Sequence, residues 1–214
     1  MTNLSDVEFV VRTIAQTAVD NEKYFGDLDA VVGDGDLGYS LARGFEIVLK
    51  DWDSYDRTDI STFLSKVAIA ITSRIGGTSG PIWGTAFLRA AGVAKGKTDI
   101  TGDDVVAMLR AAIAGIMARG NAELGDKTLL DVLAPVTDTV EAQLAAGSDS
   151  ATILPAAAQT ARAAADATTP MIARRGRAAY TGERSIGSPD AGAVAVAVIL
   201  EALASGWQNR AGAR

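Results

Sequence analysis

Residues 101–117 have the sequence TGDDVVAMLRAAIAGIM, and this stretch indicates most directly which kind of fold the chain adopts. Thr101 and, three residues later, Asp104 form an acidic variant of the capping box that begins helices. This capping box stands directly ahead of the apolar stretch Val105–Met117. The stretch therefore predicts a helix with a defined start.

Elsewhere in the chain apolar residues recur at three- and four-residue steps, which is the spacing of one helix face, while the alternating pattern of strands is scarce. The clearest examples are Val10, Ile14 and Ala18, and Phe63, Val67, Ala70 and Ile71. Glycine, proline and aspartate concentrate between the periodic stretches, where connecting loops are expected. We predict a single all-α domain over residues 1–214 with about eight helices. The predicted helices cover residues 5–23, 38–50, 60–73, 80–94, 102–119, 127–145, 150–172 and 190–206. The small side chains of residues 156–165 favour close helix packing over the alternative, a cavity for a lipid-like molecule.

Composition excludes several classes of function. The 20 Lys and Arg against 26 Asp and Glu give a net charge of −6, so no basic surface for nucleic acid or anionic membrane is expected. The chain has no cysteine and no histidine, which excludes disulfides, thiol nucleophiles, imidazole bases and ordinary zinc sites. Catalysis must then use carboxylates, hydroxyls, Lys or Arg, backbone dipoles, or a hard cation such as Mg²⁺.

The ends of the chain predict a cytoplasmic protein. The first ten residues, MTNLSDVEFV, carry acidic side chains where a signal peptide would be basic and then apolar. No window reaches 18 uncharged apolar residues, because Glu201 interrupts the apolar run Ala191–Ala204.

The first candidate site is the segment LDAVVGDGDLG, residues 28–38, which places Asp29, Asp34 and Asp36 between two helical stretches. Gly33 and Gly35 permit backbone conformations that turn these carboxylates toward a common point. Converging carboxylates repel one another unless a cation lies between them, and Mg²⁺ prefers oxygen ligands. An Asp/Gly turn that caps the next helix is the alternative, and spacing alone does not choose between them.

Three further segments suit anion or ligand binding, although each also has an ordinary structural explanation. Residues 76–84, GGTSGPIWG, combine a glycine-rich backbone with hydroxyls near a helix start but lack the lysine of a Walker A loop. Gly120 and residues 125–129, GDKTL, suit a helix end followed by a helix cap. Residues 175–192 form a long glycine-punctuated loop in which Arg177 or Arg184 is suited to a phosphate.

Taken in order, the segments LDAVVGDGDLGYSLARGF, GGTSGPIWGTAF, GDKTLLDVLAPV and GRAAYTGERSIGSPDAGAVA resemble the L subunit of dihydroxyacetone kinase, its nucleotide-binding subunit. The resemblance implies a barrel or bundle of about eight antiparallel amphipathic helices. It also implies two Mg²⁺ ions and ADP or ATP as cofactors, with Asp29, Asp34 and Asp36 as metal ligands and, with Arg177, as catalytic residues. The implied nucleotide contacts are Leu37, Gly38, Tyr39, Ser40, Thr78, Ser79, Gly120, Leu129, Arg177, Asp190, Ala191 and Gly192.

The resemblance further implies phosphoryl transfer to a small ketose, dihydroxyacetone or a similar one. In this family a separate K subunit holds the ketone through a histidine, which this chain lacks, so a partner is required for turnover. Stand-alone L subunits keep ADP as a coenzyme recharged by a phosphotransferase-system M subunit, whereas fused relatives exchange ATP. The short chain favours the first arrangement, and a homodimer is left open.

One residue departs from the family pattern, because Leu37 stands where GDGDHG has histidine. A backbone contact survives this change, while a side-chain hydrogen bond to phosphate does not. The departure opens two alternatives to the leading hypothesis. One is an ATP-dependent kinase subunit for another small ketose such as a tetrulose, and the other is a catalytically impaired, nucleotide-binding regulatory module.

Overall fold

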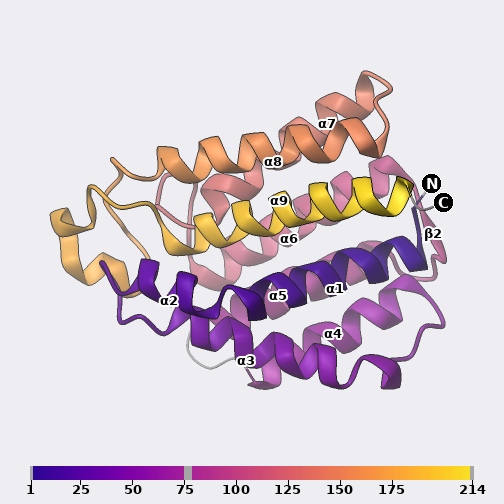
Figure 1. The fold of residues 1–214 in the computed structure, drawn as a ribbon, viewed down its shortest axis with the longest axis horizontal. Coiled ribbons are helices and arrows are strands. Elements are labelled where there is room, and N and C mark those ends of the chain that lie inside the picture. The colour runs from indigo at the N-terminus through magenta and orange to yellow at the C-terminus, as the bar shows by residue number, and fades with distance from the viewer. Residues whose placement is uncertain (1, 75–78, 213–214) are drawn as a thin grey trace. The chain divides into compact units, whose positions relative to one another are not determined.

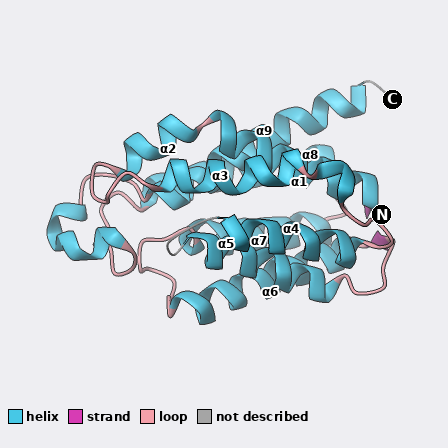
Figure 2. Ribbon diagram, turned by 90° about the horizontal axis from the view of Figure 1, so that it is seen from below, coloured by secondary structure: helices cyan, strands magenta, loops and turns pink. Residues whose placement is uncertain are grey.

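The computed structural model describes residues 2–74 and 79–212. Within these residues the fold is all-α, as predicted, and helices make up most of the ribbon (Figure 2). The α-helices are α1 (Leu4–Asp20), α2 (Glu22–Asp29), α3 (Leu37–Lys50), α4 (Ile60–Arg74), α5 (Ser79–Val93), α6 (Gly102–Gly120), α7 (Leu130–Ala145), α8 (Ser150–Ala167) and α9 (Ala191–Gly212). Two 3₁₀ segments, η1 (Trp52–Ser54) and η2 (Arg177–Ser185), and one antiparallel pair, β1 (Thr2–Asn3) with β2 (Asp99–Ile100), complete the described elements.

The described elements divide into two compact units. Unit 1 consists of Met1–Glu22 and Gly38–Ala122, and unit 2 consists of Lys23–Leu37 and Glu123–Arg214. The expectation of one domain over residues 1–214 stays a prediction.

Unit 1 is organised around buried aromatic rings. Phe45 on α3 meets the rings of Trp83 and Phe87 on α5 edge to face, at centroid distances of 5.9 and 6.4 Å. Phe63 on α4 meets Trp52 in the same way at 5.5 Å. Both Phe45 and Phe63 are fully buried, and each such ring contributes roughly 2–3 kcal/mol through removal of apolar surface from water. Helices α4 and α5, and α5 and α6, pack against each other around this core.

Unit 2 packs helices with small side chains. Helix α8 lies beside both α7 and α9 (Figure 1). Ala157, Ala161 and Ala165 recur at four-residue steps along α8 and are buried, which fits the close packing expected of this Ala-rich stretch. By length and composition, Ala191–Arg210 of α9 is apolar enough to cross a membrane, and half of that segment is buried within the protein.

Helix starts follow the capping chemistry, with small shifts from the predicted boundaries. The capping box at Thr101 is confirmed, because the Asp104 N–H donates to Thr101 Oγ1 and the Thr101 N–H donates to the Asp104 carboxylate. Ser5 and Ser150 begin two of the predicted helices, and the structure shows that Asn3 caps α1 and Asp149 caps α8. Each of these caps accepts a backbone N–H of the first helical turn through its side-chain oxygen.

Other element boundaries also differ from the predictions. The predicted helix 5–23 ends at Asn21, whose side-chain amide and backbone N–H both donate to the Thr17 carbonyl, and α2 begins anew at Glu22. Helix α7 begins at Leu130 rather than residue 127, because Lys127 has a left-handed φ of 63°. Helix α8 ends at Ala167, and the loop predicted at 175–192 contains η2.

Candidate active site

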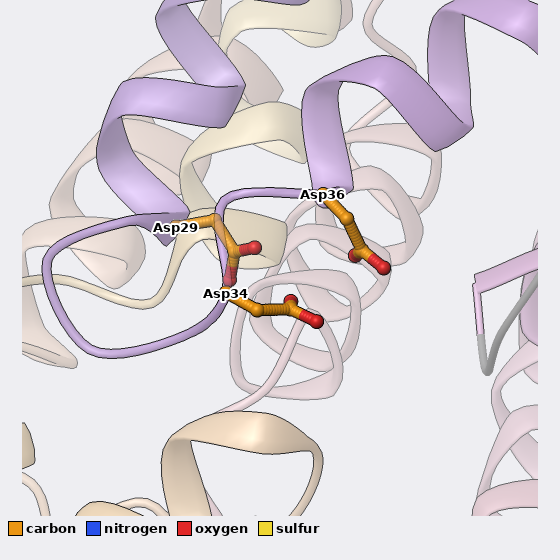
Figure 3. Close-up of side chains that lie close together, drawn as sticks. All are labelled: Asp29, Asp34 and Asp36. Carbon is orange, nitrogen blue, oxygen red and sulfur yellow. The ribbon is translucent and has the colours of Figure 1, made fainter.

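The three predicted metal ligands lie together at the loop between α2 and α3. Asp29 is the last residue of α2, Asp34 and Asp36 lie in the loop, and α3 begins at Leu37. One oxygen from each carboxylate lies within 4.8 Å of the others, and Asp34 and Asp36 are exposed (Figure 3). The structure therefore gathers the acidic residues that the sequence placed in one segment.

Close backbone packing shapes this loop. The carbonyl of Asp29 accepts hydrogen bonds from the N–H groups of Gly33 and Val32 at 2.6 and 3.2 Å. A Cβ at Gly33 would lie 2.2 Å from Asp29 Oδ1, so only glycine fits there. Gly35 has a φ of +77°, which favours glycine. The Leu37 N–H donates to Asp29 Oδ2 at 3.3 Å and so orients that carboxylate.

The electrostatics of the cluster favour a cation. Although the Asp36 side chain is exposed, partial loss of its surrounding water and then the carboxylates of Asp34 and Asp29 raise the pKa of Asp36, and Arg177 opposes this shift. Arg177 Nη1 lies 2.8 Å from Asp34 Oδ2, which partly balances the negative charge. Three carboxylates with only oxygen donors match the ligand preference of Mg²⁺, so these residues fit that ion.

The predicted nucleotide contacts at the start of α9 also lie together. Gly192 lies close to Leu129, because a Cβ added at Gly192 would be 3.7 Å from the Cβ of Leu129. Asp190 caps α9, because its carboxylate accepts the Ala193 N–H at 2.7 Å. Burial is the largest cause that raises the pKa of Asp190 to about 7, with smaller contributions from Asp131 and Asp29. Ala191, between Asp190 and Gly192, is buried.

Other predicted contacts belong to unit 1. Gly38, Tyr39 and Ser40 form the first turn of α3, where Gly38 is buried and Tyr39 is exposed. Ser79 begins α5, and Gly120 ends α6. Gly120 lies close to the first turn of α5, because a Cβ added at this glycine would be 3.3 Å from Ile82 Cδ1. Thr78 and the preceding glycines of the GGTSG turn lie outside the described residues.

Sequence reasoning missed one buried charge. Lys127 is 2% exposed, and its ammonium donates to three backbone carbonyls of the chain between Met171 and Ser188. Its neighbour Asp126 forms an ion pair with Arg175 at 2.9 Å. The GDKTL segment predicts a helix cap, and no spacing in the sequence distinguishes a buried lysine from an exposed one.

Comparison with known proteins identifies the family. The model of the DAK2 domain matches residues 31–205. The ADP-binding subunit DhaL of the PEP-dependent dihydroxyacetone kinase from Escherichia coli (strain K12) is 37% identical over 182 residues, which cover 85% of this chain and 87% of that protein. The L-erythrulose 1-kinase of Mycolicibacterium smegmatis is 38% identical over 199 residues, which cover 91% of this chain and 34% of that protein.

A solved structure agrees with these sequence matches. The dihydroxyacetone kinase from C. freundii in complex with AMP-PNP and Mg²⁺ matches 94% of this chain and 33% of its own chain, with a TM-score of 0.76 and 26% identity. The chain therefore belongs to the DAK2-domain family of phosphotransferases, together with the ADP-binding L subunits of dihydroxyacetone kinases.

Proposed function

We propose that the chain is the Mg²⁺-nucleotide-binding subunit of a dihydroxyacetone-type kinase, which transfers a phosphoryl group from nucleotide to a small ketose. The observation that carries this proposal is the convergence of Asp29, Asp34 and Asp36 beside Arg177. An oxygen-only ligand set next to a guanidinium is suited to holding Mg²⁺ and phosphate oxygens together. Membership of the DAK2-domain family supports the same assignment.

The residues have distinct roles in this proposal. Asp29, Asp34 and Asp36 would hold Mg²⁺, which when bound neutralises charge on phosphate oxygens. The Leu37 N–H keeps Asp29 oriented toward the cluster. Arg177 has five N–H donors in a planar fork and can release Asp34 to pair with a phosphate.

The remaining predicted contacts would bind the nucleotide. Leu129 offers an apolar surface to the adenine, and Asp190, Ala191 and Gly192 place the start of α9 beside it. Leu37–Ser40, Thr78, Ser79 and Gly120 are the further contacts that we propose from the family resemblance.

We further propose that a K subunit supplies the ketose and that a phosphotransferase-system M subunit recharges bound ADP. The absence of histidine means that this chain cannot hold the ketone through an imidazole. The 37% identity to a subunit named as PEP-dependent and ADP-binding supports ADP as a coenzyme. The tetrulose alternative is supported by relatives named as L- and D-erythrulose kinases.

The test is nucleotide binding by cluster variants. Titration calorimetry with Mg-ADP is expected to give a large loss of affinity for Asp34→Asn and Asp36→Asn, with the helical circular dichroism retained. Asp53→Asn, which changes an exposed aspartate of η1, is the matched control and should bind as the wild type does. Unchanged affinity in both cluster variants would remove the metal assignment.

A further inference from the structure

The Lys127 ammonium lies at the centre of a carbonyl cage. Its Nζ donates to the carbonyl of Met171 at 3.1 Å, to that of Ser188 at 2.7 Å, and to that of Ser185. An ammonium has three donors, and here each has a backbone acceptor. Burial lowers the pKa of Lys127, and the Asp190 carboxylate opposes the shift. Backbone carbonyls therefore take the place of water as acceptors for all three N–H donors of the Lys127 ammonium.

These carbonyls come from both ends of one loop, residues 171–188. Met171 begins the loop and Ser188 ends it, so the Lys127 Nζ joins the two ends, which the Gly187 N–H also joins by donating to the Thr169 carbonyl at 2.9 Å. Within the loop, Ser185 Oγ accepts the Ala173 N–H and donates to the Gly182 carbonyl. Because the buried ammonium bonds to both ends of the 171–188 loop, removal of Lys127 would take away three of the hydrogen bonds that hold this loop in its conformation.

The neighbouring Asp126 holds the same loop from its other side. Its carboxylate pairs with Arg175, and its backbone carbonyl accepts the Arg174 N–H at 3.0 Å. The Asp126-Lys127 dipeptide thus contacts the chain just before Arg177, at the last residue of η2, and again after η2 at Ser188. Arg177, the first residue of η2, pairs with Asp34 of the aspartate cluster.

We propose that Lys127 is a positioning residue that, by closing the 171–188 loop, holds Arg177 against the aspartate cluster and so sets the affinity for Mg-nucleotide. The inference rests on the proposed function for its effect on binding, but loop closure itself does not. The three hydrogen bonds of the Lys127 ammonium all end on carbonyls of the loop, so its effect on the cluster passes through the loop.

Limited trypsin digestion tests loop closure without any ligand. The loop carries Arg174, Arg177 and Arg184 as exposed cleavage sites. Lys127→Met retains the apolar stem but leaves three carbonyls without their donor, so cleavage in the loop should accelerate about tenfold or more. Lys95→Met, at an exposed lysine of unit 1, is the control and should be cut at the wild-type rate. Equal protection of the loop in Lys127→Met would overturn the proposal.

A double-mutant cycle tests whether Lys127 acts through Arg177. Lys127→Met should weaken Mg-ADP binding about tenfold or more, and it should add almost nothing in an Arg177→Ala background. Independent, multiplying effects would show that Lys127 acts by another route and would contradict the proposal. If wild-type protein bound no Mg-ADP, the proposed function would fail, while the trypsin result would still decide loop closure.

Chemical rescue covers the case in which Lys127→Met folds poorly. Because the chain has no cysteine, alkylation of unfolded Lys127→Cys with bromoethylamine restores an ammonium only at position 127. After refolding, this protein should regain the trypsin protection and Mg-ADP affinity of wild type taken through the same steps. The iodoacetamide adduct, which carries no ammonium, should regain neither, and equal recovery with both reagents would overturn the proposal.

Discussion

Arg177 Nη1 lies 2.8 Å from Asp34 Oδ2, so a guanidinium already occupies one side of the aspartate cluster. Both side chains are partly exposed, and such an ion pair is weak enough to exchange partners. Arg177 therefore connects metal binding with phosphate binding in the proposed function, because its guanidinium balances the charge of the carboxylates and is also available to a phosphate. The cluster and the 171–188 loop both belong to unit 2.

Arg177→Ala should change the affinities for metal and nucleotide in opposite directions. Without the guanidinium, the carboxylates lose a competing positive charge, so Mg²⁺ alone should bind several-fold more tightly. Mg-ADP should bind about tenfold more weakly, because a charge-assisted contact to phosphate is lost. Calorimetric titrations with Mg²⁺ and with Mg-ADP measure the two effects, and a loss of affinity for both ligands would contradict this role.

Gly33→Ala should disrupt the aspartate cluster through a clash with Asp29. The added Cβ would lie 2.2 Å from Asp29 Oδ1 and 2.8 Å from the Asp29 carbonyl, so Asp29 must move away. We expect Mg²⁺ affinity to fall about tenfold or more. Gly92→Ala, on α5 with no atom within 4 Å of the added Cβ, is the control. It should bind normally and be as stable as wild type or up to about 1 kcal/mol more stable. Equal binding by the two variants would show that the position of Asp29 is unimportant.

Asp190→Asn should change how stability depends on pH. The pKa of Asp190 is raised to about 7 in the folded protein, above the unfolded value of 3.8, so the folded state holds the proton more tightly. Between these values, the stabilising contribution of the protonated group is lost as the pH rises, with a slope of at most about 1.4 kcal/mol per pH unit. Asparagine still caps α9 but does not titrate. Urea unfolding in EDTA from pH 4 to 8 should show that the free energy of unfolding of the wild type falls relative to that of the variant as the pH rises. An equal dependence of the two free energies on pH would contradict a raised pKa at Asp190.

Leu37→His tests the departure from the family pattern. The Leu37 backbone N–H, which orients Asp29, is retained by the substitution, so Mg²⁺ affinity should stay near its wild-type value. The imidazole adds a side-chain donor at the start of α3, and we expect phosphoryl transfer with a K subunit to accelerate several-fold. A wild-type protein that transfers no phosphoryl group, together with an active Leu37→His variant, would favour the regulatory alternative.

The sequence predicted most of the fold because helix starts and apolar spacing are local properties. The Thr101–Asp104 capping box and the helical periodicity around Phe63 are confirmed, as is the all-α class. The break at Asn21 was missed because asparagine is compatible with a helix interior until its side chain binds the Thr17 carbonyl. The predicted start of α7 is too early, because nothing in the sequence indicates the left-handed backbone of Lys127.

The site was predictable only where its residues are close in sequence. Asp29, Asp34 and Asp36 lie in one short segment, so the glycines between them indicated convergence. The pairing of Arg177 with Asp34 depends on tertiary structure. From the sequence alone, residues 175–192 fitted an ordinary solvent-exposed loop as well as a phosphate-binding loop. Lys127 could not be assigned, because its role exists only once the 171–188 loop has folded around it.

The most direct test of the proposed function is the nucleotide and Mg²⁺ content of freshly purified protein. Acid release followed by chromatography measures the nucleotide, and atomic absorption measures the metal. We expect near-stoichiometric ADP that survives dialysis, accompanied by Mg²⁺, and loss of both in the Asp36→Asn protein. A wild-type protein that carries no nucleotide and binds no added Mg-ADP or Mg-ATP would contradict the assignment of the aspartate cluster and of the function built on it.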